Sequence, residues 1–499
     1  MIAIPVVAST SHEALANMER AEETADLIEI RLDLLPQDAW RPLLRRRKKP
    51  FIVTLRPTRQ GGRFEGEERR RLGLLEEALC HRPAFVDLEW DTPPELIGSL
   101  LRKKAESTGL IVSYHHLSET PSDLEVITKK VTSLGGNFSK IVTQATCFAD
   151  NARILRLVEN HKGKMAAFCM GSFGMPSRIL TLRVGGTMTF GSLGSGKESA
   201  PGQIPARILK EVYRVDQIRP ETHVLGLIGN PVSHSLSPDI HNAAFQSEGC
   251  DAVYVPFQVA DVTNLFRDME SIGVEGFSVT IPHKEEIVSL LDDVDEVARM
   301  MKAVNTVYRN DGRWLGTNTD VNGIQKALET SGTDFRERRW TIIGAGGVAR
   351  AIAYTATAYG RPRSLTVLGR TRQRLEGLLH DLKAASHFPL TGATLPETDL
   401  REILQKTDIL VNGTPVGMLP RVDETPIPAH LLQSEHLVFD TVYNPMETRL
   451  LREARARGCQ TISGLRMFLH QGAAQFERWT GKTAPLALME QKARERLER

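Results

Sequence analysis

"GGNFSKIVTQA", residues 135–145, places a lysine inside a segment that otherwise has the composition of a buried β-strand. Ile141 and Val142, with small neighbours, favour the interior of a sheet, where an unpaired ammonium group is costly. Three roles would account for Lys140 in this position. It can form a buried ion pair, clamp an anionic ligand, or act as a nucleophile that forms a Schiff base.

Seven similar apolar runs accompany this segment within the first 195 residues, and helix-patterned stretches separate them. This alternation predicts a (β/α)8 barrel, with an open doubly wound sheet as the alternative. The predicted strands are IAIPVVA (2–8), LIEIRLDLL (27–35), FIVTLRP (51–57), FVDLEW (85–90), LIVSYHH (110–116), SKIVTQA (139–145), KMAAFCM (164–170) and GTMTFGSL (186–193).

Chemically active side chains concentrate within these runs or near their carboxyl ends. The set comprises Glu29, Arg31, Asp33, Arg56, Asp87, Glu89, His115, His116, Lys140 and Met170. Active sites of α/β barrels lie at the carboxyl ends of the strands, so this distribution predicts a site at the barrel mouth. In "EIRLD" (29–33), strand alternation predicts that the three charged residues share one face. Such a stripe lines a site or forms a structural ion network.

The overall composition argues against several other classes of protein. The 499 residues are 41% hydrophobic, and 63 basic against 61 acidic residues give a net charge of +2, which does not favour a nucleic-acid-binding surface. No apolar run approaches the roughly 20 residues of a membrane helix. Five scattered cysteines without metal-binding spacing predict a reducing environment and no metal site. No signal-peptide pattern is present, so we expect a cytoplasmic protein, and the sequence indicates no obligate protein partner.

The pattern of motifs changes near residue 218, and a chain of this length should contain more than one hydrophobic core. We expect the barrel over residues 1–217 and a second α/β domain over 218–330. A dinucleotide-binding domain is expected over 331–465, followed by C-terminal helices over 466–499 that return to the second domain.

The segment "WTIIGAGGVA" (340–349) predicts a strand, a tight turn and a helix start, although such a turn can also lack a ligand. Backbone amides at this turn can bind a pyrophosphate, and the candidate residues are Gly344, Ala345, Gly346, Gly347, Val348 and Ala349. The next predicted strand ends in Arg370 and Thr371, where an acidic residue would bind the ribose of NAD. A guanidinium pairs with a 2′-phosphate that a carboxylate would repel, so we predict NADP(H) over NAD(H).

Polar residues also follow predicted strands in the second domain. Lys284 lies in "SVTIPHK" (278–284) and Asp320 in "GTNTD" (316–320). A lysine–aspartate pair can hold a ketone oxygen and mediate proton transfer while a hydride is delivered. The serines of "SHSLSP" (233–238) can hold a carboxylate or merely cap a helix.

Residues 222–490 resemble shikimate dehydrogenases. The motifs SHSLSP, VTIPHK, AVNT, GTNTD, GAGGVARA, NGTPVGM and GLRMFLHQGAAQFERWTG occur in that order. The resemblance implies that Lys284 and Asp320 are the catalytic pair. It also implies that the substrate contacts are Ser235, Ser237, Ser278, Thr280, Asn305, Tyr443 and Gln471. Ser278 stands where many members carry asparagine, which bears on the preference between shikimate and quinate-like ligands.

Residues 1–215 resemble type I 3-dehydroquinate dehydratases. The matching pieces are EIRLD, LRP followed by GG, SYH, SKIV, SR (177–178), TF (189–190) and SAPGQ (199–203). The resemblance implies that Lys140 forms an imine with the substrate ketone and that His115 is the general acid and base. The implied substrate contacts are Glu29, Arg31, Arg56, Arg178, Ser199 and Gln203, with Met170 and Phe190 as pocket walls. Gln60 and His116 replace the glutamate and aspartate that are common in the family.

The two resemblances imply one bifunctional enzyme of aromatic precursor biosynthesis. Its first half would dehydrate 3-dehydroquinate to 3-dehydroshikimate through a lysine Schiff base, and its second half would reduce that product to shikimate with NADPH. One alternative is a carbon–carbon lyase barrel fused to a quinate dehydrogenase. In another, one half is degenerate and serves in binding or in stabilising its neighbour.

Overall fold

Each of the eight strands predicted for the N-terminal region is present in the computed structural model, and a helix follows each of them. The structure describes residues 1–36, 39–46, 48–383, 386–395 and 399–498. The chain divides into two units, Met1–Pro238 with Asp251–Glu275 and Asp239–Cys250 with Gly276–Arg499.

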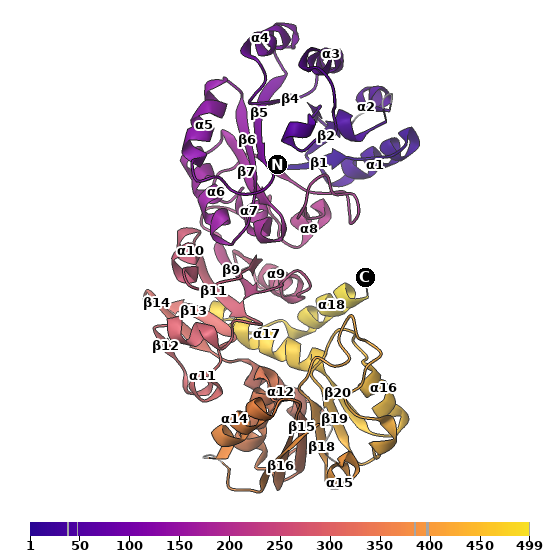
Figure 1. Ribbon diagram of the computed structural model, residues 1–499, viewed down its shortest axis with the longest axis vertical. Helices are drawn as coiled ribbons and strands as arrows, with labels where there is room; N and C mark the ends of the chain where they lie inside the picture. The colour runs from indigo at the N-terminus through magenta and orange to yellow at the C-terminus, as the bar shows by residue number, and fades with distance from the viewer. Residues whose placement is uncertain (37–38, 47, 384–385, 396–398, 499) are drawn as a thin grey trace. The chain divides into compact units, whose positions relative to one another are not determined.

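The eight strands pair in parallel in the order β7-β6-β5-β4-β3-β2-β1-β8, and helices surround them (Figure 1). Strand β8 pairs with β1, and β7 and β8, the two ends of this order, are also in contact. The sheet therefore curls into a nearly closed barrel, which confirms the predicted fold over an open sheet. The strands are β1 (Ile2–Val6), β2 (Leu27–Arg31), β3 (Phe51–Thr54), β4 (Phe85–Glu89), β5 (Gly109–His116), β6 (Phe138–Gln144), β7 (Met165–Met170) and β8 (Thr189–Phe190). The helices are α1 (Ser11–Thr24), α2 (Trp40–Arg46), α3 (Glu68–Leu79), α4 (Pro94–Lys103), α5 (Leu124–Ser133), α6 (Ala149–Asn160), α7 (Met175–Leu180) and α8 (Ala206–Glu211), with 3-10 turns η1 (Leu32–Leu34), η2 (Thr58–Gln60) and η3 (Ser172–Gly174).

Alternation along the strands decides which side chains face the barrel interior. Val142 packs in one buried cluster with Ala166, Phe168 and Phe190. Lys140 lies two positions before Val142 on β6, so it projects to the same side of the strand. The apolar cluster therefore forms part of the surroundings of the lysine.

The prediction that strand alternation carries Asp33 onto the charged stripe was wrong. Strand β2 ends at Arg31, and Asp33 lies in the 3-10 turn η1 that follows. The turn still returns Asp33 to Arg31, whose guanidinium donates to both of its carboxylate oxygens at 2.9 and 2.7 Å.

Strands with both parallel and antiparallel pairing follow the barrel. In the first unit, β9 (His223–Gly229) pairs in parallel with β10 (Ala252–Gln258), and α10 (Leu265–Ser271) follows. In the second unit, β13 (Thr306–Asn310) pairs antiparallel with β11 (Val274–Val279) and β14 (Arg313–Thr317). The remaining elements of this part of the chain are α9 (Ser237–Ser247), η4 (Glu286–Leu290), β12 (Asp293–Val294), α11 (Glu296–Met301) and α12 (Asp320–Glu329).

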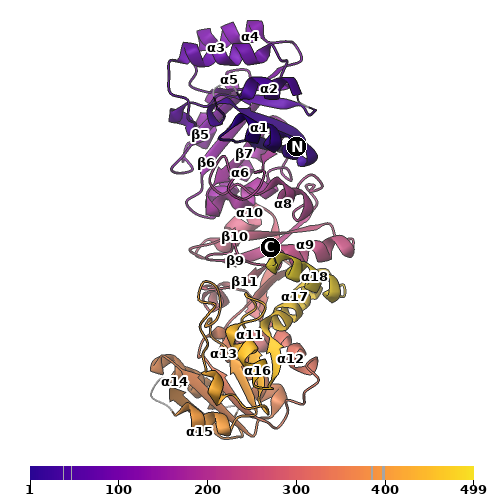
Figure 2. The same ribbon diagram turned by 90° about the vertical axis from the view of Figure 1, so that its right-hand side faces the viewer.

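The second unit also contains a parallel sheet in the order β17-β16-β15-β18-β19-β20, with helices on both faces (Figure 1; Figure 2 gives the view turned by 90°). This is the strand order of a dinucleotide-binding Rossmann fold, which confirms the predicted fold of the region. Its elements are β15 (Arg339–Ile343), α13 (Gly347–Thr355), the π-helical turn η5 (Ala356–Gly360), β16 (Ser364–Gly369), α14 (Arg372–Lys383), β17 (Leu390–Thr394), α15 (Leu400–Gln405), β18 (Ile409–Asn412), η6 (Ala429–Leu431), β19 (Leu437–Asp440), α16 (Arg449–Ala456) and β20 (Gln460–Ser463).

Two C-terminal helices, α17 (Gly464–Thr480) and α18 (Leu486–Leu497), complete the chain. Helix α17 approaches α12 closely at Gly323, where an added Cβ would lie 2.6 Å from the carbonyl oxygen of Met467. A side chain at Gly323 would push the helices apart, and this contact brings Gln471 of α17 beside the start of α12.

Candidate active sites

Lys140 lies inside the barrel between two carboxylates and against an aromatic ring. Its Nζ is 3.3 Å from Glu29 Oε1, 3.2 Å from Asp87 Oδ2 and 4.0 Å from the centroid of Phe190. The residue is 4% exposed. The ammonium group is therefore paired, which explains how β6 tolerates a lysine that sequence composition alone makes costly.

Arg56 connects the lysine site with the imidazole of His115. The guanidinium donates to Asp87 Oδ2 at 2.8 Å and Glu89 Oε1 at 3.2 Å, and lies 3.0 Å from His115 Nδ1. A guanidinium can only donate hydrogen bonds, so His115 Nδ1 accepts this one from Arg56. When His115 is neutral, its proton is therefore on Nε2. Burial, and then the positive charge of Arg56, lower the pKa of His115 well below its ordinary value. His115 is thus neutral at neutral pH.

Two buried acidic residues of β4 were recognised in the sequence but given no role. Alternation places Asp87 and Glu89 on one face of the strand, which is the signal that could have assigned them to the site. Burial raises the pKa of Glu89 to about 7. Burial opposes ionisation of Asp87 as well, and it is the largest single influence. The charges of Arg56 and Lys140 together outweigh it and hold the pKa of Asp87 below its ordinary value. Arg71, which is fully buried, pairs with the other oxygen of Glu89.

Gln60 and His116, the two residues that depart from the dehydratase pattern, make different contacts near His115. Gln60 Oε1 accepts the backbone N–H of His115 at 2.9 Å, so the amide fixes the strand end and not the imidazole ring. His116 is half-buried, and its Nδ1 accepts the backbone N–H of Glu119 at 3.3 Å. The geometry therefore places His115, and not His116, beside Arg56.

Arg178, on α7, is a buried arginine for which no carboxylate partner is found among the described residues. It is 1% exposed, its Nη2 donates to the carbonyl oxygen of Pro201 at 3.3 Å, and its guanidinium lies 4.7 Å from the Phe168 ring. Within the described structure its Nε has no hydrogen-bond partner. Burial lowers the pKa of Arg178 to about 10. A buried cation of this kind is suited to bind an anion.

Aromatic rings and one loop join Arg178 to the lysine site. Phe168 and Phe190 lie 5.8 Å apart between ring centroids, with one cation against each ring. In the loop that contains Pro201, Gln203 Oε1 accepts the backbone N–H of Ser199 at 2.8 Å and its hydroxyl at 3.3 Å. Met170, at the end of β7, belongs to the same buried cluster as both rings. The predicted dehydratase residues therefore converge on the barrel interior.

In the second unit, Lys284 and Asp320 form an ion pair with 2.6 Å between Nζ and Oδ2. Lys284 lies in the turn after β11, and Asp320 is the first residue of α12. Asn305 Nδ2 donates to the other oxygen of Asp320 at 2.8 Å and to Gln471 Oε1 at 3.4 Å. Four residues that are far apart in the sequence thus meet, with the carboxylate held in one orientation.

Three more predicted substrate contacts lie in the second unit. Tyr443 stacks on Phe468 with 4.7 Å between ring centroids, and burial raises the pKa of its hydroxyl. Thr280 is half-buried directly after β11. Ser278 Oγ donates to Gln475 Oε1 at 3.0 Å, so this hydroxyl already has a protein partner.

Gln475 was not among the residues predicted from the sequence, although it contacts the predicted residue Asn305. Its Nε2 donates to the carbonyl oxygen of Asn305 at 3.2 Å and to Thr306 Oγ1 at 3.1 Å. It lies one helical turn after Gln471 on α17, and this spacing on one helix face was the available signal.

Ser235 and Ser237 lie in the first unit. The backbone N–H of Ser237 donates to Ser235 Oγ at 3.1 Å, and α9 begins at Ser237. This geometry is that of a helix start, whose backbone donors also suit a carboxylate.

The turn after β15 has the geometry that a dinucleotide requires. Gly344 has a φ of +117°, and an added Cβ there would lie 2.9 Å from the carbonyl oxygen of Gly413, which follows β18. An added Cβ at Gly346 or Gly347 would meet no atom within 4 Å, so the start of α13 is open. Ala349 packs against Gly413 and supplies the close helix-to-sheet contact of the fingerprint. The residues present therefore fit a bound dinucleotide.

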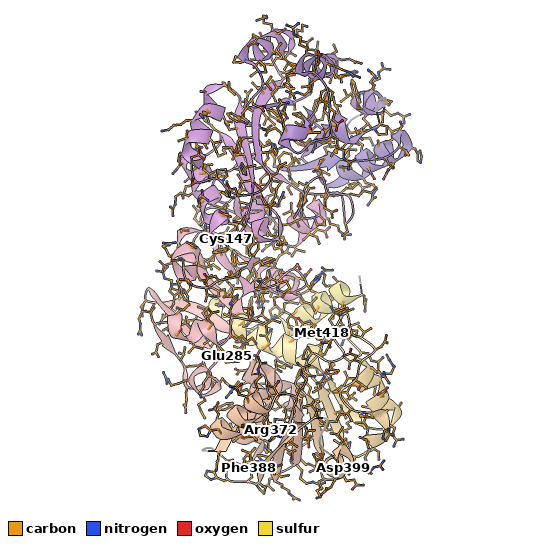
Figure 3. All side chains as sticks on the ribbon, viewed as in Figure 1. Cys147, Glu285, Arg372, Phe388, Asp399 and Met418 are labelled. Atoms are coloured by element: carbon orange, nitrogen blue, oxygen red, sulfur yellow. The ribbon has the colours of Figure 1, made fainter. Side chains whose placement is uncertain are left out.

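Exposed basic residues follow the next strand of the sheet. Arg370 and Thr371 lie between β16 and α14 and are exposed. Arg372, the first residue of α14, is labelled in Figure 3. Residues 369–374 include no acidic residue, so no fixed negative charge in this turn opposes a 2′-phosphate.

Neither a metal centre nor a membrane-spanning helix is present among the described residues. No cluster of three or more His, Cys, Asp or Glu side chains there is arranged to hold a metal ion. Among the described helices, none combines the length and apolar character needed to span a membrane.

The folds and sites define two classes of enzyme in one chain. A buried lysine, a neutral imidazole and a buried arginine without an acidic partner among the described residues, all in an α/β barrel, are the groups that a lyase with nucleophilic and acid–base chemistry requires. The Rossmann fold with a Lys–Asp pair is that of a dinucleotide-dependent oxidoreductase.

Comparisons with known proteins agree with both classes. The family model of type I 3-dehydroquinase matches residues 2–220. The shikimate dehydrogenase substrate binding domain matches residues 227–307, and the shikimate 5′-dehydrogenase C-terminal domain matches 464–494. A chloroplastic bifunctional 3-dehydroquinate dehydratase/shikimate dehydrogenase of Arabidopsis thaliana is 37% identical over 98% of this chain and 83% of its own length.

Two further relatives cover the second half. A shikimate dehydrogenase (NADP(+)) of Moorella thermoacetica is 42% identical over 56% of this chain and 95% of its own. A crystal structure of a shikimate dehydrogenase in complex with NADP+ matches with a TM-score of 0.52 and 36% identity, over 56% of this chain and 96% of the other. The chain belongs to the family of bifunctional 3-dehydroquinate dehydratase/shikimate dehydrogenases, which joins a lyase and an oxidoreductase of the shikimate pathway. This membership confirms the bifunctional interpretation of the sequence.

Proposed function

We propose that the barrel dehydrates 3-dehydroquinate through an imine on Lys140. The observation that carries this proposal is the pair of buried cations against the two neighbouring rings of Phe168 and Phe190. Arg178 lacks an acidic partner among the described residues, and it would bind the substrate carboxylate while Lys140 attacks the ketone. The remaining proposed substrate contacts are Glu29, Arg31, Arg56, Ser199 and Gln203.

The neutral imidazole of His115 would move the protons of the elimination. When Arg56 exchanges its Nη1 contact with His115 for one with the substrate and keeps its Nη2 contact with Asp87, His115 Nδ1 is released to accept the C2 proton that the protonated imine acidifies. The C1 hydroxyl then leaves as water after taking that proton from His115. Hydrolysis of the imine returns Lys140 and releases 3-dehydroshikimate.

We propose that Lys284 and Asp320 complete the reduction of 3-dehydroshikimate to shikimate. The chain uses NADP(H), which supplies the hydride when bound. Lys284 Nζ would donate to the ketone oxygen and pass a proton to the forming alkoxide, while Asp320 holds the ammonium group in place. The proposed substrate contacts are Ser235, Ser237, Ser278, Thr280, Asn305, Tyr443 and Gln471. The cofactor contacts would be Gly344, Ala345, Gly346, Gly347, Val348, Ala349, Arg370 and Thr371.

The expected domain limits and location belong to the same proposal. Residues 1–217 would form the dehydratase, 218–330 and 466–499 the substrate-binding part of the reductase, and 331–465 its NADP-binding part. The five cysteines are free thiols, which supports the expected cytoplasmic location.

Borohydride trapping tests the imine. Sodium borohydride added with 3-dehydroquinate should reduce the imine and leave a mass gain that peptide mapping places on Lys140. The Lys140→Ala variant should show no adduct. Lys164→Ala, which removes an exposed lysine next to β7, should label like the unaltered chain. A folded, unaltered chain without an adduct would refute the proposal.

A further inference from the structure

Asp87 shares one carboxylate oxygen between two cations. Its Oδ2 lies 3.2 Å from Lys140 Nζ and 2.8 Å from Arg56 Nη2, and the residue is fully buried. The guanidinium fixes the position of this oxygen and favours its ionised form, since the pKa of Asp87 lies below its ordinary value. Asp87 is therefore a negative charge held in place beside the reacting nitrogen.

Imine formation changes the number of donors on that nitrogen. The ammonium group of Lys140 has three N–H donors, and two of its contacts are Glu29 and Asp87. Condensation with a ketone releases one water and leaves a protonated imine, which keeps the positive charge but has a single N–H. One of the two carboxylates must then lose its hydrogen bond to the nitrogen.

Glu29 is the carboxylate better suited to leave. Its Oε1 is otherwise held by the neutral hydroxyl of Thr54, at 2.9 Å. Asp87 is bound to the charged guanidinium of Arg56, and hydrogen bonds between charged groups are the stronger kind. Glu29 is also one of the residues proposed to accept from a substrate hydroxyl, which it can do after releasing the lysine.

We propose that Asp87 is the counter-ion of the protonated imine and accepts its single N–H, while Glu29 turns to the substrate. This inference rests on the proposed function of Lys140. A carboxylate at this position stabilises the protonated imine, which withdraws electrons from C2 far better than a neutral imine. The other charged or titratable groups that face this site are Glu29 and Arg31 of β2, Arg56 after β3, Glu89 of β4 and His115 of β5.

The Asp87→Asn variant tests the proposal through the pH profile of dehydration. With the counter-ion removed, the imine loses its proton at lower pH, so the basic limb of kcat should move down by at least about one pH unit. At neutral pH, kcat should fall by about 100- to 1,000-fold. Reduction of 3-dehydroshikimate by the same chain should be unchanged, which measures the concentration of folded protein.

Two further variants complete the test. Asp150→Asn removes another buried barrel carboxylate, one that accepts the backbone N–H of Thr146, and it should leave the dehydration profile unchanged. Asp87→Glu keeps the charge but displaces it, so its basic limb should stay in place while kcat falls by at least about tenfold. If Asp87→Asn does not fold, this variant decides, and a kcat equal to that of the unaltered chain overturns the proposal.

The outcomes separate this inference from the proposed function beneath it. If the unaltered chain yields the Lys140 adduct and Asp87→Asn has an unmoved basic limb and a kcat within about threefold, the counter-ion role is overturned. If the unaltered chain yields no adduct, the imine itself is refuted.

Discussion

Replacing Arg178 by methionine should stabilise the barrel and disable it at the same time. The guanidinium is buried and forms no ion pair with a carboxylate among the described residues. Burial lowers its pKa to about 10. A depression of this size corresponds to about 3 kcal/mol that the charged side chain costs the fold at neutral pH. The charged Arg178 lowers the free energy of unfolding because the unfolded chain holds this proton more tightly than the folded chain does. The cost is fully present below about pH 10, and it would decrease as the pH rises above that value and the buried Arg178 loses its charge.

Methionine removes that cost but also removes two favourable contacts. The cation–aromatic contact with Phe168 and the hydrogen bond to Pro201 contribute about 1 kcal/mol each. A net gain of about 1 kcal/mol remains, equivalent to about 2–4 °C in the unfolding midpoint of a barrel of this size. Loss of the proposed carboxylate contact should lower kcat/KM for 3-dehydroquinate by about 30- to 5,000-fold.

Calorimetry and steady-state kinetics on the full chain measure both effects. Arg71→Met is the matched control, because Arg71 is equally buried but pairs with Glu68 and Glu89. Breaking that network should destabilise the barrel by about 3–5 kcal/mol, opposite in sign to the Arg178 variant. A lower midpoint for Arg178→Met, together with a kcat/KM within about tenfold of the unaltered chain, would refute the reasoning.

Three further predictions concern the other proposed groups. Lys284→Met should lower kcat for 3-dehydroshikimate reduction by about 100- to 10,000-fold and leave dehydration unchanged. The reductase kcat is measured from NADPH absorbance, and an unchanged value would contradict the proposed role of Lys284. Arg370→Asp should raise KM for NADPH by about 10- to 100-fold and change that for NADH by less than about threefold, whereas equal losses would refute the 2′-phosphate contact. Because the fold holds His115 neutral, the acid limb of dehydratase kcat/KM should lie below about pH 6.5, and barrel stability should decline as pH falls through that value. An acid limb at or above about 6.5 would contradict this.

Strand periodicity and glycine placement were sufficient to predict both folds. Alternating β-rich runs such as the one around Lys140 repeat eight times, and each corresponds to a strand of the barrel. The turn at Gly344 lies between a strand and a helix, as the fingerprint requires. These patterns are local in the sequence, so they can be recognised without knowledge of tertiary contacts.

The partners of the charged residues could not be predicted in the same way. Lys140 meets Asp87 across 53 positions and Glu29 across 111, and the closure of the barrel creates both contacts. Gln475 likewise meets Asn305 across 170 positions because α17 packs on the strands of the second unit. Asp33 was misplaced because the end of β2 depends on a turn that alternation does not show. Such pairings are set by non-local packing.

In the proposed function, one chain performs two successive reactions at two different lysines. The most direct measurement follows NADPH consumption after 3-dehydroquinate is added to the purified chain. The unaltered chain should consume NADPH steadily, and Lys140→Ala and Lys284→Ala should consume none. Adding 3-dehydroshikimate should restore consumption to Lys140→Ala alone. Continued consumption of NADPH from 3-dehydroquinate by Lys140→Ala would contradict the account.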